Sequence, residues 1–313
     1  MRMIVTGASG FIGRNFLLRL PGDWEVTALY HRSQDFLRFV TERKLANIAP
    51  MRCDLTREED VNAVAKSAGG ADACVYLAAN GDPAFSATDP LLDLRQNVVA
   101  LVNFLRVLQV KRFVFFSSGA VYDGLSGLVS PDTMLSPRLP YAISKLASEQ
   151  YVRFFAGQGR ISEYVILRFF GAYGPYEPER KIYTRLIRAF ALEAGNEFTV
   201  RGDGENLIDA MHVDDTVEGI LKAVVGDGRN LVVDFATGSP MTVNELVRKA
   251  AAAFHREPIV IRHEGAVPEY IRFRVSREGM KRHFGFEPKV PLEEGLMRSA
   301  EFLKGRESVP VRS

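Results

Sequence analysis

The chain has 313 residues, of which 47% are hydrophobic and 25% charged, and 40 Lys and Arg against 38 Asp and Glu give a formal net charge of +2. These ordinary globular values exclude disorder, collagen and coiled coil as descriptions of the whole chain, and the length suggests about two domains. The balanced charge argues against a nucleic-acid binder, which usually carries a basic stripe, but a local positive field can still bind a small anion.

The first half of the chain alternates short β-branched or aromatic runs with longer helix-periodic stretches. The strand-like runs are nearly continuous in apolar residues, which is typical of a parallel sheet covered on both faces. Repeated β-α units of this kind predict an α/β fold, a Rossmann-type doubly wound parallel sheet, in a dinucleotide-binding domain of residues 1–170. The expected strands are 2–6, 24–30, 49–53, 72–77, 111–117 and 162–168, and the expected helices are 11–20, 56–67, 91–108 and 140–156.

The pattern changes after Arg168, where glycines and prolines within residues 171–178 mark a loop before a basic helical stretch. We expect residues 171–304 to form mainly a smaller C-terminal α/β substrate-binding lobe, with some segments returning to the main sheet. Residues 305–313 are expected to be a frayed tail. The expected strands of this half are 198–201, 231–235 and 259–262, and its expected helices are 181–193, 214–225, 242–254 and 291–303.

Cysteine content and hydropathy point to the compartment. Cys53 and Cys74 are too few for a disulfide framework and lie in strand-like apolar surroundings, so we expect two small buried side chains. No run approaches the roughly 18 apolar residues of a membrane span, and the N-terminus lacks a signal-peptide pattern. These features predict a cytoplasmic protein without membrane contact. The five histidines show no metal-ligand spacing, so no metal site is expected.

A glycine-rich loop follows the first predicted strand, where residues 6–13 read TGASGFIG. Gly7 permits a tight turn, Gly10 lets the backbone approach a pyrophosphate, and Gly13 allows close contact between helix and strand. The helix N-terminus adds unpaired N–H groups and a partial positive charge. At the first β-α junction this spacing predicts a dinucleotide site. The expected cofactor contacts in the loop are Gly7, Ser9, Gly10, Phe11, Ile12 and Gly13.

The end of the second predicted strand bears on the choice of cofactor. An acidic residue there would bind the ribose hydroxyls of NAD, but residues 28–33 read ALYHRS. Arg32 and Ser33, helped by His31, can instead hold a 2′-phosphate through charge-assisted bonds. The sequence therefore favours NADP(H) over NAD(H). The alternative is that Arg32 is an ordinary solvated residue after a strand.

A tyrosine and a lysine share one face of the helix predicted over 140–156. Tyr141 and Lys145 stand four residues apart, and Ser118 ends the fifth predicted strand at the sheet edge where α/β folds bind ligands. A tyrosine with a pKa of about 10 must lose about three units to act as a base near neutral pH. A cation at about 4 Å can supply an effect of that size, so we expect Lys145 to depress the pKa of Tyr141.

Together these features resemble the extended short-chain dehydrogenase/reductase family, the NAD(P)-dependent nucleotide-sugar epimerases, dehydratases and reductases. The resemblance covers nearly the whole chain. Beyond the glycine loop, its motifs are Asp54-Leu55, Leu77-Ala78-Ala79, Asn97, Ser118, Tyr141 with Lys145, Arg168 through Pro175, Gly202-Asp203-Gly204, His212 through Asp215, and Phe284 through Pro288.

The resemblance implies a role for each matching residue. Lys145 would bind the nicotinamide ribose, Tyr141 would exchange the proton of a substrate hydroxyl or ketone, and Ser118 would hydrogen-bond the same oxygen. Asp54 and Leu55 would flank the adenine. It also implies a homodimer formed through helices 91–108 and 140–156. The other expected cofactor contacts are Leu77, Ala78, Ala79, Asn97 and Phe170.

The sequence also departs from the family pattern. Members that eliminate water carry an Asp-Glu pair where this chain has Gly119-Ala120, so reduction or epimerisation is expected rather than 4,6-dehydration. Gly171 replaces an asparagine and Ile208 an arginine of the usual grip on a nucleotide diphosphate, and no clear Arg-x-Gly-Asp segment precedes Ser276. Four basic residues can replace that grip or form a solvated face. They are Arg180, Lys181, Arg185 and Arg188.

The sequence thus predicts an NAD(P)(H)-dependent oxidoreductase or epimerase acting at a ring carbon, C4, of a nucleotide sugar. Two alternatives stay open. One is an NADPH-dependent reductase of a non-nucleotide alcohol or ketone, which the altered grip permits. The other is a non-catalytic NADP-sensing protein, against which the intact Ser118, Tyr141 and Lys145 argue.

Overall fold

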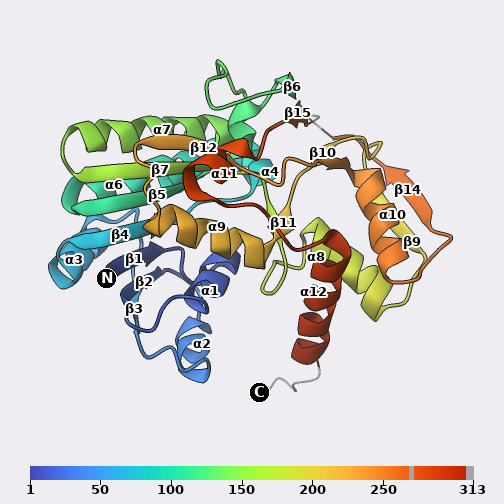
Figure 1. Cartoon of the computed structure of the whole chain (residues 1–313), viewed down its shortest axis with the longest axis horizontal. Helices are drawn as coiled ribbons and strands as arrows, with labels where there is room; N and C mark the ends of the chain where they lie inside the picture. The colour runs from blue at the N-terminus through green and yellow to red at the C-terminus, as the bar shows by residue number, and fades with distance from the viewer. Residues whose placement is uncertain (268–270, 308–313) are drawn as a thin grey trace.

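A seven-stranded parallel sheet forms the larger part of the molecule, on the left of Figure 1. The structure is a computed structural model that describes residues 1–267 and 271–307. Every neighbouring pair of strands is parallel, in the order β12-β7-β5-β4-β1-β2-β3, which confirms the predicted Rossmann-type fold. The strands are β1 (Arg2–Thr6), β2 (Glu25–Tyr30), β3 (Ile48–Arg52), β4 (Ala71–Tyr76), β5 (Val110–Ser118), β7 (Ile161–Phe169) and β12 (Leu231–Phe235).

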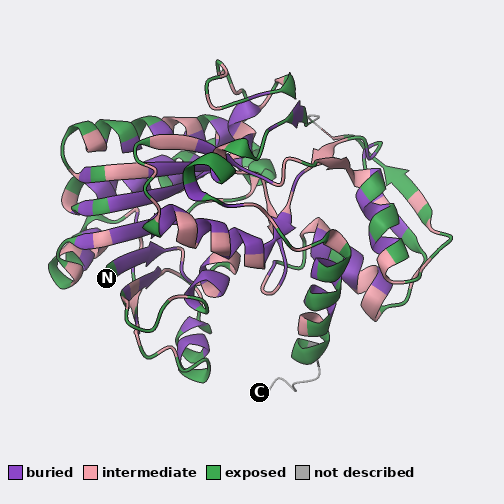
Figure 2. Cartoon of the chain, viewed as in Figure 1, coloured by how far each residue is buried: buried purple, intermediate pink, exposed green. Residues whose placement is uncertain are grey.

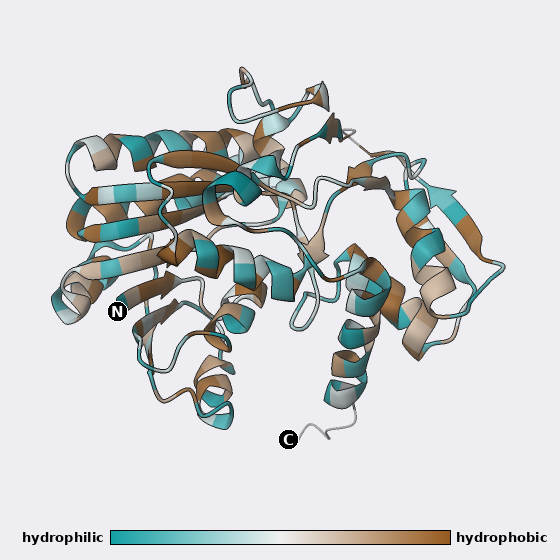
Figure 3. Cartoon of the chain, viewed as in Figure 1, coloured by the Kyte–Doolittle hydropathy of each residue, from teal (hydrophilic) through white to brown (hydrophobic). Residues whose placement is uncertain are grey.

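Two layers of helices cover the sheet, one on each face. The first layer is α1 (Phe11–Leu17), α2 (Phe36–Glu42), α9 (Val213–Val225) and α11 (Glu278–Phe284), and the second is α3 (Glu58–Ala68), α6 (Ala100–Val107) and α7 (Pro140–Gly157). In β1, Met3 and Val5 belong to the core under the first layer, and Ile4 belongs to the core under the second. Both faces are therefore buried, which explains the continuous apolar runs of the strands (Figures 2 and 3).

The segment predicted as one helix over 91–108 consists of three pieces. These are α5 (Pro90–Leu94), a π-helical turn η1 (Arg95–Val99) and α6. A short helix that the sequence analysis did not anticipate, α4 (Pro83–Thr88), precedes them, and the Asp82 side chain caps it by accepting from Ala84 N at 3.1 Å. The helix α2 was also not anticipated. Turns of π-helix often occur at functional sites, and this one contains Asn97.

The C-terminal half builds a smaller lobe with its own hydrophobic core. Its strands pair only two at a time: β9 with β14 and β8 with β11 in parallel, and β10 with β13 antiparallel. Its elements are β8 (Ala172–Tyr173), α8 (Ile182–Ile187), the π-turn η3 (Arg188–Leu192), β9 (Glu197–Arg201), β10 (Leu207–Ile208), β11 (Met211–His212), β13 (Met241–Thr242), α10 (Val243–Ala253), β14 (Val260–Glu264) and α12 (Leu292–Glu307).

Two segments of this half return to the main sheet. The strand β12 pairs with β7 at the sheet edge, and α9 packs against α1. A further short pair joins β6 (Ser126–Leu128) to β15 (Arg272–Arg274), and a 3-10 turn, η2 (Gly119–Tyr122), follows β5. Residues 305–307, the start of the expected frayed tail, continue α12. The rest of that prediction, residues 308–313, lies outside the described residues.

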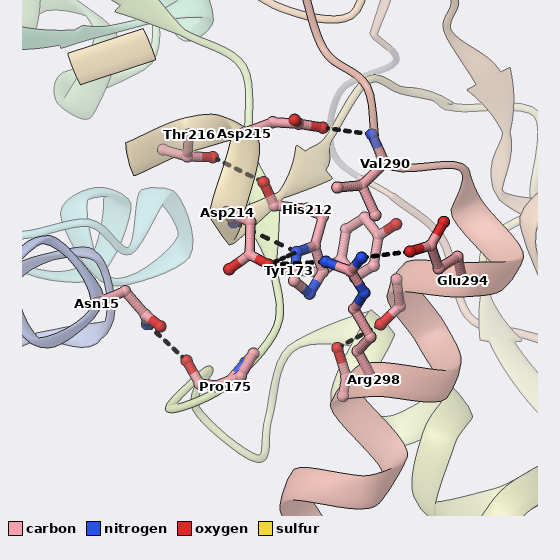
Figure 4. Close-up of polar contacts among 12 residues, drawn as sticks. Asn15, Tyr173, Pro175, His212, Asp214, Asp215, Thr216, Val290, Glu294 and Arg298 are labelled. Carbon is pink, nitrogen blue, oxygen red and sulfur yellow. Dashed lines mark hydrogen bonds and ion pairs between the residues drawn. The ribbon is translucent and has the colours of Figure 1, made fainter. Parts of the chain in front are cut away.

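Hydrogen bonds and ion pairs join the lobe to the main sheet's helices (Figure 4). The Asn15 side chain on α1 donates to the carbonyl of Pro175 at 2.8 Å. Asp214, at the start of α9, pairs with Arg298 of α12 at 2.9 Å. The neighbouring Asp215 accepts from Val290 N at 2.9 Å. The start of α9 is thus tied both to the sheet side and to α12.

The structure also bears on membrane contact, metals and cysteines. Cys53 and Cys74 are buried free thiols, and burial raises the pKa of Cys53 to about 12 and that of Cys74 well above its usual value. Within residues 1–267 and 271–307, no helix is long and apolar enough to cross a membrane. The same residues contain no group of three or more His, Cys, Asp or Glu side chains arranged to hold a metal ion.

Candidate active site

The glycine loop packs tightly against the end of β4. The Thr6 hydroxyl accepts from Leu77 N at 3.1 Å and from Ala78 N at 3.0 Å, which ties β1 to β4. Gly7 has a φ of 64°, and a Cβ there would lie 2.9 Å from Ala78 N. A Cβ on Gly13 would lie 2.4 Å from the Gly7 carbonyl oxygen. These two glycines are therefore required by close backbone contacts.

Gly10 differs from Gly7 and Gly13, because the space beside its Cα is open to solvent. It caps α1 and is exposed, and a Cβ there would meet only the Gly7 carbonyl oxygen, at 3.2 Å. Phe11 and Ile12 begin the helix beside it, so backbone N–H groups at this end of α1 face an open surface. This exposed glycine edge at the carboxyl end of the sheet fits the pyrophosphate of a dinucleotide.

An arginine that the sequence analysis did not anticipate links this loop to the end of β2. Arg14 donates to the Ser9 carbonyl at 2.9 Å, to the Ser33 hydroxyl at 3.1 Å and to Asp35 at 2.8 Å. The Ser33 hydroxyl in turn donates to Asp35 at 2.6 Å. An acid therefore stands two residues beyond the segment 28–33 that lacks one, with an arginine paired to it. The signal available in the sequence was the position of Arg14 directly after Gly13.

His31 and Arg32, which were expected to bind a 2′-phosphate, have different neighbours in the structure. His31 lies 3.3 Å from Asp54, whereas Arg32 is exposed. Burial opposes ionisation of Asp54, but hydrogen bonds from Thr56 and the positive charges of His31 and Arg32 lower its pKa overall. A cavity of about 410 Å³ opens here, at the end of β3. It is lined by His31, Arg52, Asp54, Arg57, Glu59, Asp60 and Ala63.

The expected catalytic residues come together. Ser118 ends β5, where its hydroxyl accepts from Ala120 N at 3.1 Å and lies near enough to the Tyr141 hydroxyl to lower the pKa of Tyr141. Lys145 lies one turn further along α7, donates to the Phe116 carbonyl at 2.8 Å and has its nitrogen 6.0 Å from the centre of the Tyr141 ring. Only 9% of Tyr141 and 4% of Lys145 are exposed. A phenol and an ammonium group, both buried, thus lie near the partly buried Ser118 hydroxyl.

Burial has the largest effect on the pKa of Tyr141. Burial raises the pKa of Tyr141, the hydrogen bond with Ser118 lowers it less, and the negative charge of Asp93 raises it further. Burial also lowers the pKa of Lys145 to about 8, against the charges of Asp93 and Glu149. Spacing on a helix reveals a neighbouring cation but not the cost of burying a phenolate, so the effect of Lys145 on Tyr141 stays a prediction.

A buried network of hydrogen bonds joins α7, the helix that carries Tyr141 and Lys145, to the strands of the main sheet. Arg168 on β7 binds Glu149 of α7 through two bonds, Nε to Oε1 at 3.0 Å and an η-nitrogen to Oε2 at 2.8 Å. The Ser117 hydroxyl donates to the same carboxylate at 2.5 Å. Arg168 also donates to the Tyr122 hydroxyl at 3.0 Å, and that hydroxyl donates to Asp234 at 2.8 Å. The network joins β5, η2, α7, β7 and β12, and sequence reasoning anticipated only Arg168.

Asn97 and Phe170 support the site rather than face it. The Asn97 side chain accepts from Asn80 N at 2.8 Å and donates to Asp93 at 2.9 Å. The Phe170 ring packs against Gly119, where a Cβ would come within 2.9 Å of the ring. Their side chains are therefore taken up by protein contacts in the unliganded chain.

The two positions that hold a nucleotide diphosphate in many family members carry no charge in this chain, because they are Gly171 and Ile208. Ile208 lies in β10 and pairs with Met241, and a Cβ on Gly171 would lie 3.1 Å from Ala210 Cβ. Of the basic residues, Arg185 donates to the Thr199 carbonyl at 3.3 Å and lies over the Phe198 ring, so it belongs to the lobe. The other basic residues differ in their surroundings. Arg180 pairs with Asp82 at 3.1 Å, and burial followed by the charge of Arg180 lowers the pKa of the half-buried Lys181.

Comparison with known proteins identifies the family to which the chain belongs. The model of the NAD dependent epimerase/dehydratase family matches residues 3–232. The dTDP-glucose 4,6-dehydratase of Streptomyces griseus is 30% identical over 94% of this chain and 91% of its own. The UDP-glucose 4-epimerase of Mycolicibacterium smegmatis is 26% identical over 98% of this chain and 99% of its own.

Solved structures agree across the whole fold. The UDP-glucose 4-epimerase of Thermotoga maritima, solved with UDP-glucose, has a TM-score of 0.87 and 26% identity, covering 98% of this chain and 100% of that one. MoeE5, solved with UDP-glucose and NAD, has a TM-score of 0.85 and 28% identity with the same coverage. The resemblance to the extended short-chain dehydrogenases/reductases is thereby confirmed. The chain is an enzyme of the NAD-dependent epimerase/dehydratase family.

Proposed function

We propose that the enzyme transfers a hydride at a ring carbon, C4, of a nucleotide sugar, and that it reduces a 4-ketone or epimerises C4. The observation that carries the proposal is the convergence of Ser118 at the end of β5 with Tyr141 and the buried Lys145 of α7. Two hydroxyls at one point can both reach one substrate oxygen, so that one holds it while the other exchanges its proton. The UDP-glucose in two similar structures supports a nucleotide sugar as the substrate class.

The two parts of the chain then divide the work. Residues 1–170 hold the dinucleotide, through the glycine loop and the residues around Asp54, and residues 171–304 mainly hold the substrate. The dinucleotide, when bound, supplies or accepts the hydride. Tyr141 gives a proton to the oxygen of a ketone or takes one from an alcohol, while Ser118 donates a hydrogen bond to the same oxygen. Lys145 binds the ribose and offsets negative charge on Tyr141.

We further propose that the enzyme does not remove water from its substrate. Dehydration needs an acid and a base beside the reacting ring, and the positions that carry them in dehydratases are here Gly119 and Ala120. A side chain at Gly119 would meet the Phe170 ring at 2.9 Å, so an acid fits there only if Phe170 moves. Incubation with dTDP-glucose tests this point, because a 4-keto-6-deoxy product would refute it.

Absorbance of the reduced nicotinamide separates the remaining activities. UDP-, dTDP-, GDP- and CDP-sugars and their 4-keto forms are offered with each cofactor. A reductase consumes NADPH in step with ketone, whereas an epimerase turns over on bound cofactor without net change in absorbance and needs product analysis. Tyr141→Phe is expected to lose at least about a thousandfold in turnover while it still binds cofactor. Unchanged turnover in this variant would refute the role of Tyr141.

The preference for NADP(H) is also a proposal. Arg32 is exposed at the end of β2, and no acid stands within residues 28–33, which supports a 2′-phosphate there. The Asp35 carboxylate is already paired with Arg14. We expect Arg32→Ala to weaken NADP binding about tenfold and to leave NAD binding unchanged, with Arg38→Ala on α2 as the control. Tighter binding of NAD than of NADP by the natural protein would refute the preference.

A second candidate substrate is an alcohol or ketone without a nucleotide. The uncharged Gly171 and Ile208 at positions that grip a diphosphate in the family favour it. Activity with small ketones, together with no activity on the nucleotide-sugar panel, would select this candidate. Mass spectrometry of compounds that co-purify with the protein gives an independent answer.

We also propose a homodimer through the face formed by α5, η1 and α7. Large apolar side chains are exposed there, including Leu91 at 57%, Ile143 at 48% and Phe154 at 54%. Such a patch on the surface of a folded chain is typical of a protein interface. We expect Phe154→Glu to sediment as a monomer and Leu128→Glu, on the exposed β6, to remain a dimer. A natural protein that sediments as a monomer would refute the proposal.

A further inference from the structure

Two hydrogen bonds fix the register between α7 and the segment α4–α5–η1. Tyr141 N donates to the Ser86 hydroxyl at 3.1 Å, and the Ser148 hydroxyl donates to the Asn97 carbonyl at 3.2 Å. Residue numbers rise in the same direction along both partners, so the two stretches run parallel. Residues between 86 and 97 therefore lie beside residues 141–148, the part of α7 that carries the catalytic groups.

Asp93 lies in the middle of this interface and is fully buried. Its Oδ1 accepts from the side-chain amides of Asn80 at 2.8 Å and Asn97 at 2.9 Å. Its Oδ2 is buried and has no hydrogen-bond partner among the residues described. A buried carboxylate with one oxygen unpaired is costly unless a positive charge stabilises it.

The cation available to Asp93 is Lys145. The other carboxylate near Lys145 is that of Glu149, which Arg168 already binds through two bonds. Among the charges that oppose the effect of burial on the pKa of Lys145, Asp93 comes before Glu149. Asp93 and Lys145 each bond to neutral groups, so they interact through space across the helix interface.

The same carboxylate acts on Tyr141 in the opposite sense. A negative charge favours the protonated form of any neighbouring group, and Asp93 raises the pKa of Tyr141 beyond the effect of burial. The titratable groups of α7 on which the charge of Asp93 acts are Tyr141 and Lys145. The groups of the β4–α4 loop and η1 that bond to Asp93 are the neutral side-chain amides of Asn80 and Asn97.

We propose that Asp93 is a positioning residue whose buried negative charge holds Lys145 as an ammonium ion and Tyr141 as a neutral phenol, which poises the site for ketone reduction. The inference rests on the proposed function, since it assigns a direction to the same site. In that direction the ketone carbon gains a hydride from the reduced nicotinamide dinucleotide, which is oxidised. The ketone oxygen gains the Tyr141 proton as the C=O π bond breaks, and the tyrosinate is reprotonated from solvent.

Asp93→Asn tests the charge with little change of shape, because the carbonyl of asparagine can still accept from both amides. A unit charge about 10 Å away shifts a pKa by roughly one unit at an effective dielectric near 20. Ultraviolet titration of tyrosinate, read as the difference between each protein and its Tyr141→Phe form, follows Tyr141 directly. We expect Tyr141 in Asp93→Asn to ionise about one pH unit lower than in the natural chain.

The control is Asp89→Asn, which removes the same charge from the cap of α5, where Asp89 accepts from Leu92 N at 2.9 Å. We expect no shift in that variant. If Asp93→Asn unfolds, Asp93→Ser removes the charge and keeps a small hydroxyl acceptor. A folded charge-removing variant in which Tyr141 titrates as before, or at higher pH, overturns the proposal. The titration needs no substrate, so it is independent of whether the proposed reaction is found.

Once a ketone substrate has been identified, the pH profile of its reduction gives a second measurement. The alkaline limb of the reduction rate reports loss of a proton from Lys145 or Tyr141, and removal of the Asp93 charge lowers the pKa of both groups, so the limb is expected to move down by about one unit in Asp93→Asn. A purely structural role for Asp93 would lower the rate at every pH and leave the limb in place.

Discussion

The ion pair between Arg168 and Glu149 provides the sharpest test of how the site is held together. The side chain of Arg168 is 3% exposed and that of Glu149 is fully buried. Arg168→Met removes three strong hydrogen bonds, two to Glu149 and one to Tyr122, and leaves the Glu149 carboxylate buried without a cation. Breaking such a pair from one side costs about 3–5 kcal/mol of unfolding free energy, mostly through the uncompensated charge.

A double-mutant cycle separates two contributions to the unfolding free energy: the lost attraction between Arg168 and Glu149, and the cost of leaving the Glu149 charge buried without a partner. Arg168→Met with Glu149→Leu removes both charges, so it is expected to recover at least about 2 kcal/mol relative to Arg168→Met alone. Urea unfolding measures each variant, with fluorescence of Trp24, the single tryptophan, and circular dichroism as two probes of one transition. A cost below about 1 kcal/mol for Arg168→Met, or strict additivity of the two changes, would refute the reasoning.

Three further predictions concern the loop, the pH dependence and the thiols. Gly13→Ala places a Cβ 2.4 Å from the Gly7 carbonyl oxygen and should weaken cofactor binding at least about tenfold by calorimetry, whereas Gly22→Ala, with open space around it, should not. The pKa of Asp234 is raised to about 7, chiefly by burial, so the folded state binds the extra proton and stability falls as pH rises from about 4 to 7. Asp234→Asn should flatten the loss between about pH 4 and 7, and an unchanged slope would contradict the assignment. Cys53 and Cys74 should react with a thiol reagent only after unfolding, and fast reaction in the native protein would show that they are accessible.

The sheet could be predicted from the sequence because its strands are buried on both faces. All six strands expected in the first half are present within one or two residues, since a continuous apolar run has few other uses. The glycine loop was predictable for a similar reason. Gly7 and Gly13 fill positions that no larger residue can occupy, so the spacing itself records the contacts.

The electrostatic surroundings of the site were not predictable, because they depend on partners far apart in the chain. Asp93 stands 52 residues before Lys145, and its importance follows from the packing of α5 on α7. Arg14 is likewise an ordinary helix residue until β2 brings Ser33 beside it. The π-turn at Asn97 leaves no clear periodic signal, since one wide turn interrupts two otherwise regular helical pieces.

The return of β12 to the main sheet has a consequence for how the chain is made. Until residue 235 has left the ribosome, β7 remains an edge strand with a free row of N–H and C=O groups beside the catalytic helix. The first 170 residues therefore lack one strand of the sheet that they otherwise form. We expect a fragment that ends at residue 170 to aggregate, because the edge of β7 is then uncovered. A chimera with a relative should therefore take β12 and the rest of the main sheet from the same parent protein.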